Sequence, residues 1–378
     1  MNSDVLIIGG GVIGLSIARE LHKRGAGRIT IVEKGRCGKE SSWAAAGMLG
    51  PQAETDETGP FFDLCCTSRD MYPRLASELL DETGIDIELD QTGTLHAAFD
   101  DEDLEHLRTR YQWQKNAGLP VDLLSADEVR SIEPLVSPDI RAALFFPNDW
   151  QVENRKLLAA LRRYADLNDI TVIESTPVDA LRIDGRKVIG AAAIDGDLDA
   201  DQTILATGAW TSFIKLGTME LPVKVEPVRG QMVAFTSEET MFRHVIYGRN
   251  GYIVPRRDGR ILAGSTTEKV GFDVSTTASA IDSLKEMAGE LIPDIKSLPV
   301  SDQWAGLRPF AADGMPVLGA VHSIEGLFVA TAHYRNGILL APVTAKVAAQ
   351  SIVDGVRSRY CETFGVDRLG TASAGAGR

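Results

Sequence analysis

In this 378-residue sequence, the residues whose type and spacing most clearly indicate a chemical role are three glycines near its start. Gly9, Gly11 and Gly14 have G-x-G-x-x-G spacing and directly follow an apolar run. Gly9 permits a tight turn, Gly11 lets the backbone approach a pyrophosphate, and Gly14 lets the next helix pack closely on the strand. The N-terminus of that helix adds N–H donors and a positive dipole for phosphate. The spacing therefore predicts a dinucleotide site.

A carboxylate stands where such a site needs one. Residues 29–32 are a second short apolar run, and Glu33 follows it, nineteen positions after Gly14. An acid at this distance accepts hydrogen bonds from an adenosine ribose and disfavours a 2′-phosphate. We therefore expect an unphosphorylated ribose beside Glu33.

A charged junction near the C-terminus raises a separate question. The segment TAHYRNGILLAP, residues 331–342, puts Arg335, Asn336 and Gly337 between an apolar strand and an apolar helix. Asn-Gly alone could be a simple turn, but packing gives no reason for the arginine. We interpret Arg335 as facing a site. Pro342 is expected in the first turn of the helix, where a missing N–H costs little.

The surrounding elements suggest two interleaved parts. Residues 5–25, 175–185 and 203–210 alternate buried strands with helix or turn, whereas residues 223–265 read as successive strands, with Asp258-Gly259 as a hairpin turn. Residues 100–136 and 276–291 have helical patterns, and Ser125 is a suitable N-cap. This predicts a discontinuous nucleotide-binding domain with a sheet-based domain inserted in two pieces.

Composition narrows the partners and the compartment. The net charge of −14 argues against nucleic acid and against an anionic membrane surface. The cysteines, at positions 37, 65, 66 and 361, have no metal-like spacing, so we expect no metal site and a reduced, cytoplasmic compartment. Asp4 stands where a targeting leader would be basic.

Longer motifs add a family resemblance. Ala18, Leu21 and Gly25 extend the glycine fingerprint, and ESSWAAAGMLGPQAE (40–54), GYIVPR (251–256), WAGLRPFAADGMPVLG (304–319) and the H-x-R-N-G at 333–337 follow. With these, residues 3–366 resemble the D-amino-acid oxidase superfamily, and most closely the glycine oxidases of thiamine biosynthesis.

The resemblance implies an α/β fold (α+β overall) with a Rossmann-like FAD-binding domain and an inserted antiparallel-sheet substrate domain. The expected FAD-binding segments are 1–87, 152–219 and 304–366, and the expected substrate-domain segments are 88–151 and 220–303. Residues 367–378 are expected to be a flexible tail.

The resemblance also implies which residues hold FAD. A hydroxylated pair meets the pyrophosphate, a run of small residues lies along the flavin ring, a valine contacts adenine, and a helix N-terminus faces the ring's N1–C2=O edge. The residues implied are Gly9, Gly11, Val12, Ile13, Gly14, Glu33, Lys34, Ser41, Ser42, Ala45, Ala46, Gly47, Met48, Val178, Ala206, Thr207, Gly208, Trp210, Arg308, His333, Arg335, Asn336, Gly337, Ile338 and Leu339.

The family pattern assigns the substrate to four positions, two of which, Arg308 and Arg335, also contact FAD. Tyr252 and Arg308 are implied to hold a substrate carboxylate, and Arg335 to reach the substrate. A guanidinium suits this role because its planar fork donates two parallel hydrogen bonds. Asn250, which stands where some glycine oxidases carry histidine, is placed among the catalytic residues by the same pattern, without an expected proton role. Ala332 departs from the glycine common among relatives.

The implied activity is oxidative deamination of glycine and related small amines, with hydride transfer to FAD and oxygen as acceptor. FAD is expected to be non-covalent, because the cysteine that links it in sarcosine oxidases has no counterpart in residues 304–319. A homo-oligomer, tetramer or dimer, is implied. Sarcosine-oxidase-like, D-amino-acid-dehydrogenase-like and hydroxy-acid-oxidase activities remain alternatives, as does a non-catalytic FAD-binding protein.

Overall fold

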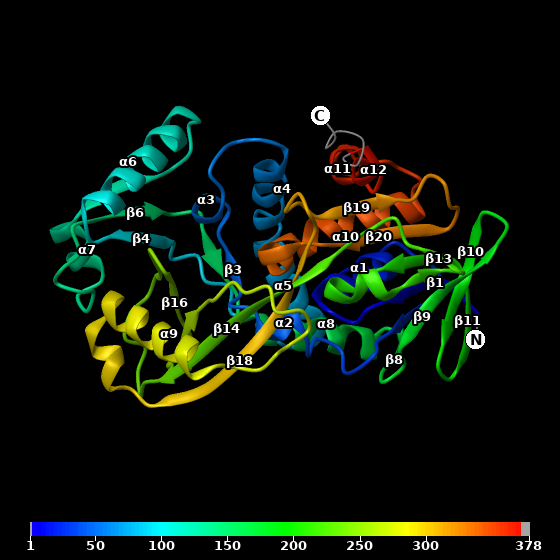
Figure 1. The fold of residues 1–378 in the computed structure, drawn as a ribbon, viewed down its shortest axis with the longest axis horizontal. Helices are drawn as coiled ribbons and strands as arrows, with labels where there is room; N and C mark the ends of the chain where they lie inside the picture. The colour runs from blue at the N-terminus through cyan, green and yellow to red at the C-terminus, as the bar shows by residue number, and fades with distance from the viewer. Residues whose placement is uncertain (1, 372–378) are drawn as a thin grey trace.

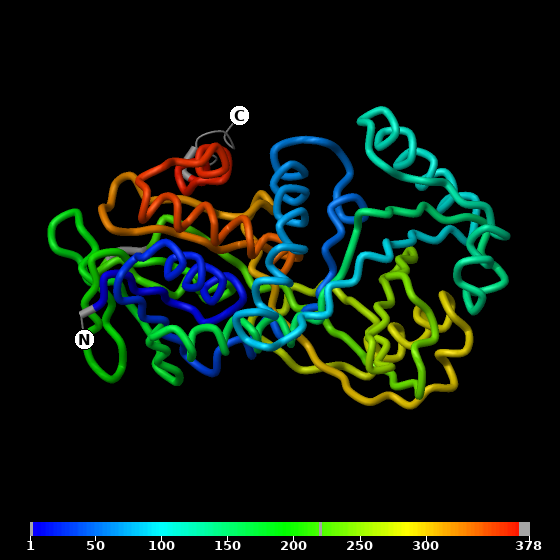
Figure 2. Tube along the Cα trace, turned by 180° about the vertical axis from the view of Figure 1, so that it is seen from behind, coloured from blue at the N-terminus to red at the C-terminus, as the bar shows by residue number. Residues whose placement is uncertain are grey.

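The structure, a computed structural model, describes residues 2–371 and divides into two lobes (Figure 1). One lobe contains a ten-stranded sheet and the other an eight-stranded sheet. The first and the last elements that the structure describes both lie in the first lobe, where α1 and α10, from early and late in the sequence, run side by side (Figure 2).

The first sheet has the Rossmann-like order at its centre. Strand β1 pairs in parallel with β2 and β11, β2 with β8, and β11 with β20. The sheet consists of β1 (Asn2–Ile8), β2 (Ile29–Val32), β8 (Thr171–Ile173), β9 (Val178–Asp184), β10 (Lys187–Ala193), β11 (Gly196–Leu205), β12 (Lys215–Leu216), β13 (Met219–Glu220), β19 (Val317–Ala320) and β20 (Leu327–Thr331). The expected strand, glycine turn and helix are confirmed, because α1 (Val12–Lys23) follows β1 directly.

The second sheet is antiparallel except for the parallel pair β4–β15. It consists of β4 (Thr94–Ala98), β5 (Asp122–Ser125), β6 (Ala142–Phe146), β14 (Glu226–Thr236), β15 (Val245–Gly248), β16 (Gly251–Pro255), β17 (Arg260–Gly264) and β18 (Val300–Phe310). The β16–β17 hairpin turns at Asp258-Gly259 as expected, with Gly259 at φ +83°. Strands β3 (Met48–Leu49) and β7 (Trp150–Gln151) form a separate pair.

Helices cover both sheets. They are α2 (Ser41–Ala44), α3 (Pro51–Glu54), α4 (Pro60–Arg69), α5 (Tyr72–Thr83), α6 (Asp101–Asn116), α7 (Ala126–Ile132), α8 (Asn154–Leu167), α9 (Ala278–Leu291), α10 (Gly337–Val353), α11 (Arg359–Phe364) and α12 (Asp367–Thr371), with 3-10 turns η1 (Gly208–Phe213), η2 (Pro293–Ser297) and η3 (Tyr334–Asn336). In the first lobe α1 packs against α8 and α10, and in the second α9 packs on β14, β16 and β17.

Three boundary expectations need correction. Residues 100–136 are two helices separated by strand β5, because Ser125 forms a capping box with Glu128 and starts α7 there. Strand β18 runs through the expected domain boundary at 303/304, since its whole length pairs with β14. The flexible tail is wrong for Asp367–Thr371, which form α12, where Arg368 donates to Asp313 at 2.7 Å. The rest of that tail lies outside the described residues.

Helix α10 carries an interior proline. Pro342 is the sixth residue of the helix and not part of its first turn, so the carbonyl of Ile338 has no N–H four residues ahead. The Tyr72 hydroxyl donates to that carbonyl, and Ser68 Oγ donates to the carbonyl of Leu339 at 2.6 Å. Side chains of α4 and α5 therefore replace the hydrogen bonding that Pro342 interrupts.

The same helix has the length and apolarity of a membrane span. Over the residues that the structure describes, Tyr334–Val353, which joins η3 to α10, is the one helical segment with these properties, and more than half of it is buried inside the protein. It packs against α1 and α4, which accounts for its apolar composition as core.

Candidate functional site

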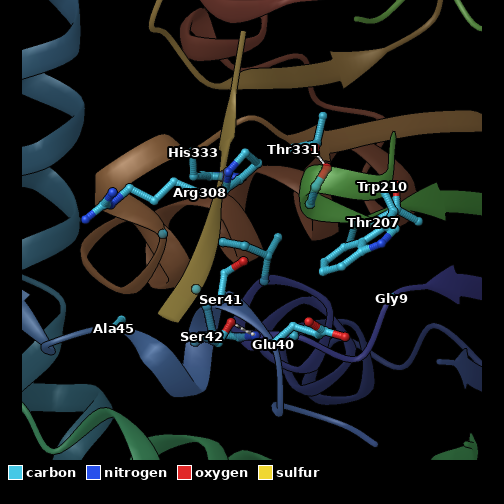
Figure 3. Close-up of a pocket in the computed structure, with 18 of the residues that line it drawn as sticks. Gly9, Glu40, Ser41, Ser42, Ala45, Thr207, Trp210, Arg308, Thr331 and His333 are labelled. Atoms are coloured by element: carbon cyan, nitrogen blue, oxygen red, sulfur yellow. Dashed lines mark hydrogen bonds between the residues drawn. The ribbon is translucent and has the colours of Figure 1, made fainter. Parts of the chain in front are cut away.

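A cavity of about 630 Å³ is lined by residues from both lobes. Figure 3 shows Arg308 at one end of the labelled residues and Trp210 at the other, with Ser41 and Ser42 between them. Nearly all residues expected to hold a cofactor line this cavity, from Gly9 on one element to Ile338 on another. The volume falls within the usual range for cofactor and ligand sites.

The glycine turn at the start of α1 depends on missing side chains. Gly9 has φ +111°, and a Cβ there would lie 2.4 Å from the carbonyl oxygen of Ala206. A Cβ on Gly14 would lie 1.9 Å from the carbonyl oxygen of Gly9. The N–H of Val12 donates to Ser42 Oγ at 3.1 Å, which brings the hydroxylated pair to the helix N-terminus. This is the geometry of a phosphate cradle.

Glu33 is fixed at the end of β2 with 8% of its surface exposed. Its Oε2 accepts from the N–H of Gly10 at 2.8 Å, and its Oε1 accepts from the N–H of Gly35 at 2.9 Å. Carboxylate oxygens have further lone pairs, so this anchored side chain can still accept from a ribose.

Hydrogen bonds fix the backbone of the small residues 44–47 along the cavity. Trp304 Nε1 donates to the carbonyl of Ala44 at 2.9 Å, and Arg256 donates to the carbonyl of Ala46 at 2.7 Å. Gly47 has φ +73°, and a Cβ there would lie 2.0 Å from the carbonyl oxygen of Val152. A backbone this bare leaves room for a planar ring. The cradle, the anchored Glu33 and this run together fit FAD.

Arg308 is a guanidinium without a carboxylate partner among residues 2–371. It donates to Ser265 Oγ at 2.6 Å and to the carbonyl of Thr266 at 3.0 Å. Gly230 permits this position, because a Cβ there would lie 2.2 Å from Arg308 Nη2. Burial lowers the pKa of Arg308, yet a guanidinium stays protonated in proteins. A charged group that lines a cavity in this state is suited to bind an anion.

Tyr252 meets Arg308 at the same serine. Tyr252 as a residue is 6% exposed, and its hydroxyl donates to Ser265 Oγ at 3.3 Å. Strands β16 and β18 therefore bring the two expected carboxylate ligands to one wall of the cavity. The Tyr247 ring lies 5.5 Å from that of Tyr252 and packs against it, but Tyr247 does not itself line the cavity.

Arg335 lines the cavity and is paired with an acid. Its Nε and Nη2 donate to Glu54 at 2.9 and 3.0 Å, and the Tyr247 hydroxyl donates to Glu54 at 2.7 Å. Burial alone would raise the pKa of Glu54, but the charge and hydrogen bonds of Arg335 keep it below its ordinary value. The Glu54 charge raises the pKa of Arg335 in turn. The first reason for an arginine at this junction is therefore its ion pair with Glu54.

Glu54 ends a short helix that is held at both ends. The Asp149 carboxylate accepts from the N–H groups of Gln52 and Ala53, at 3.1 and 2.7 Å. Arg110 donates to the carbonyl groups of Gln52, Ala53 and Thr55 at 2.7 to 3.2 Å. The position of the Glu54 carboxylate is therefore well determined.

The junction around Arg335 has a strained backbone. Ala332 has φ +58° and Tyr334 has φ +47°, both in the left-handed region. Glycine adopts this region readily, so the presence of alanine at position 332, where relatives often have glycine, carries a conformational cost. His333 Nε2 lies 3.0 Å from Thr344 Oγ1, and burial lowers the pKa of His333 to about 3. His333 is therefore neutral at physiological pH.

Three expected residues do not line the cavity. Asn250 is exposed in the turn between β15 and β16, where the tight hairpin directs it away, so its catalytic assignment is corrected. Leu339 is 1% exposed within the core cluster around α10, because the helix turns its side chain inward. Gly14 acts through the packing of α1 on the glycine turn.

Sequence reasoning missed several residues beside the cavity, above all Glu54, Gly230 and Ser265. Glu54 ends the motif segment 40–54, but Asp56 and Glu57 follow it closely, so nothing in the sequence singled it out. Gly230 and Ser265 come from β14 and the end of β17, and only the pairing of these strands brings them to Arg308.

Asp149 gives a prediction about pH. It is fully buried, and burial raises its pKa to about 7, against the hydrogen bonds from Gln52 and Ala53 and the charge of Arg69. Between pH 4 and 7 the folded protein then binds more protons than the unfolded chain, so this group's stabilising contribution is lost as the pH rises to about 7. From pH 5 to 8 the loss is at most about 3 kcal/mol.

The check is urea unfolding of the wild type and Asp149→Asn at pH 5, 6, 7 and 8. Asparagine keeps an acceptor for α3 but does not titrate. The stability of the wild type relative to the variant should fall across this range. Parallel pH curves for the two proteins would show that Asp149 does not titrate as described.

A dinucleotide cradle that opens onto an anion-binding wall from a second sheet is the arrangement of a flavin-dependent oxidoreductase. The chain belongs to the FAD dependent oxidoreductase family, DAO, whose pattern matches residues 4–351. FAD is therefore its cofactor.

The similar proteins are more specific. A glycine oxidase from Pseudomonas aeruginosa is 36% identical over 354 residues, covering 92% of this chain and 94% of the relative. The crystal structure of glycine oxidase from Geobacillus kaustophilus superposes with a TM-score of 0.90 at 34% identity, covering 97% of this chain and 98% of that one. A bifunctional protein ThiO/ThiG from Trichormus variabilis is 35% identical, covering 94% of this chain and 53% of its own length.

Proposed function

We propose that this protein oxidises glycine and related small amines, such as sarcosine and small D-amino acids. The products from glycine would be glyoxylate, ammonia and hydrogen peroxide, formed with one molecule of oxygen and one of water. The observation that carries the proposal is Arg308, a guanidinium that lines the FAD cavity without a carboxylate partner among the described residues. The glycine oxidases among its relatives support it.

The residues would divide the work as follows. Arg308 and Tyr252 bind the substrate carboxylate and orient the α-carbon, while Met232 and the small-residue run shape a narrow apolar wall. When bound, FAD would accept the hydride of the α-carbon and deliver two electrons to oxygen. Positioning supplies most of the catalytic demand, because hydride transfer needs alignment and a neutral amine but no side chain to remove the α-proton. His333 is neutral and bonded to Thr344, so we assign it no proton transfer.

Anaerobic mixing with glycine, sarcosine, D-alanine and glycolate tests the proposal. Glycine should bleach the visible absorption of the bound flavin, and oxygen should restore it with release of hydrogen peroxide. Bleaching by sarcosine alone would indicate a sarcosine-oxidase-like enzyme, and bleaching by glycolate a hydroxy-acid oxidase. Bleaching by D-alanine without peroxide would indicate a D-amino-acid dehydrogenase, and no bleaching at all a non-catalytic FAD protein.

FAD should be bound without a covalent link. Residues 304–319 contain no cysteine, and none lies among the described residues that line the cavity. Trichloroacetic acid precipitation should therefore leave the yellow colour in the supernatant. Colour retained in the washed pellet would contradict this prediction.

We further propose that the first-sheet lobe is the FAD-binding domain and the second-sheet lobe the substrate domain. The role proposed for the reaction is supply of thiamine thiazole biosynthesis, supported by the relatives named glycine oxidase and ThiO/ThiG. A homo-oligomer, tetramer or dimer, is proposed on the family resemblance, and sedimentation would test it. A cytoplasmic location agrees with four free cysteines.

A further inference from the structure

The substrate end of the cavity contains three charged side chains. Arg308 and Arg335 are positive, and Glu54 is negative. The other charged residues of the cavity follow β2 or lie on β9 and β12 of the first sheet; they are Glu33, Lys34, Glu40, Asp179 and Lys215. The substrate end therefore has a local charge of one positive unit, which one carboxylate would balance.

A chain of side-chain contacts links the two guanidiniums. Arg308 and Tyr252 both donate to Ser265 Oγ, at 2.6 and 3.3 Å. The Tyr252 ring lies 5.5 Å from the Tyr247 ring, whose hydroxyl donates to Glu54. Glu54 then accepts both hydrogen bonds from the fork of Arg335. A ligand bound at Arg308 thus has a second guanidinium in the same end of the cavity, and Glu54 already occupies it.

Glu54 holds this position tightly. Its side chain is 12% exposed against 34% for Arg335, and the short helix that carries it is fixed by Asp149 and Arg110. A bidentate pair with one fixed partner is strong and specific in geometry. An incoming carboxylate would have to displace Glu54 to reach Arg335, which would leave a buried acid without its cation.

We propose that Glu54 restricts this site to amines with a single carboxylate, because it occupies the guanidinium that would otherwise bind a second one. The inference rests on the proposed function, since it takes Arg308 as the first carboxylate anchor. Glu54→Gln keeps the size of the side chain and an oxygen for Arg335 and Tyr247, but removes the negative charge. Arg335 would then be a second anchor, and the substrate end would suit a dicarboxylate.

Ligand binding measures this without turnover. The probes are acetate, malonate, succinate and glutarate, whose carboxylates are spaced differently, and the readout is the change in visible absorption of bound FAD. Wild-type protein should bind no dicarboxylate more than about threefold tighter than acetate. Glu54→Gln should bind at least one dicarboxylate about tenfold or more tighter than acetate, equivalent to about 1.4 kcal/mol. The kcat/KM ratio of iminodiacetate to sarcosine should rise by a similar factor.

Two control variants separate charge from space. Glu54→Asp makes room but keeps the negative charge, so its preference should remain that of the wild type. In Glu54→Gln/Arg335→Gln the second guanidinium is gone, so the dicarboxylate gain should disappear. An equal gain in Glu54→Asp, or a gain that persists in the double variant, would overturn the proposal.

The remaining outcomes also decide the question. An unchanged preference in FAD-loaded Glu54→Gln overturns the inference. If that variant does not retain FAD, the test is the dicarboxylate preference of the wild-type protein. Succinate or malonate bound tenfold tighter than acetate would overturn the inference about Glu54, and equal or weaker binding would support it. Acetate binding that is lost in Arg308→Ala keeps the proposed function intact in every case. If no carboxylate perturbs the flavin of the wild type, the proposed function itself fails.

Discussion

Replacement of Arg308 by alanine should lower kcat/KM for glycine by roughly thirtyfold to several thousandfold. The loss follows from leaving a substrate carboxylate unpaired in a desolvated pocket, at a cost of about 2–5 kcal/mol, with about 1.4 kcal/mol per tenfold. Arg308 is the guanidinium that Ser265 and the carbonyl of Thr266 hold at the cavity, with no acid beside it among the described residues. Hydrogen peroxide release at varied glycine concentration gives the measurement, after FAD content is matched.

Two further variants define the cause of that loss. Arg308→Lys should not restore activity, because an ammonium lacks the two parallel donors of the guanidinium. Arg249→Ala is the matched control, since Arg249 is exposed and bonds Asp100 and Asp103 away from the cavity. Near-normal glycine turnover in Arg308→Ala would refute both the carboxylate assignment and most of the case for an amino-acid substrate.

Gly14→Ala should destabilise the protein even without FAD. The new methyl group would lie 1.9 Å from the carbonyl oxygen of Gly9. The oxygen is a backbone atom and the methyl carbon is fixed directly to the backbone, so no side-chain rotation can separate them. Strand β1 and helix α1 would have to separate at the point where they define the phosphate cradle. Overpacking of this kind costs about 1–3 kcal/mol or more. Urea unfolding of the apoprotein and FAD titration should both show a large loss.

Gly11→Ala is the informative contrast. A Cβ on Gly11 would lie 3.3 Å from Ser42 Oγ, the end of a side chain that can change rotamer. The apoprotein should therefore keep nearly wild-type stability, while FAD affinity falls because the methyl group faces the pyrophosphate. Equal apoprotein stability for Gly14→Ala and Gly11→Ala would mean that the packing argument is wrong.

Features formed by residues close together in the sequence could be predicted, whereas features formed by distant segments could be predicted only in part. The glycine turn, the β16–β17 hairpin and the Ser125 cap follow from residues close together in the chain, and all were predicted. The wall around Arg308 was predicted only in part, because Gly230 and Ser265 reach it through strand pairing across many residues. Asn250 was misplaced because a motif position does not specify which way a tight turn faces. Arg335 was correctly expected at the cavity, but its partner Glu54 lies 281 residues away.

Strand β20 completes the first-lobe sheet, and α10 is one of the helices that pack on α1, so the lobe that carries the cradle combines early and late segments of the chain. This has a consequence for biosynthesis. At about 5–20 residues per second, a ribosome needs roughly 15–70 s to reach β20 and α10. During that time β1, α1 and β2 lack the packing that β20 and α10 later provide. The inserted second sheet ends near residue 310 and so precedes β20 and α10 from the ribosome. A nascent chain truncated before β20 should therefore fail to bind FAD. The time at which the enzyme binds its flavin would then be set by release from the ribosome and not by initiation.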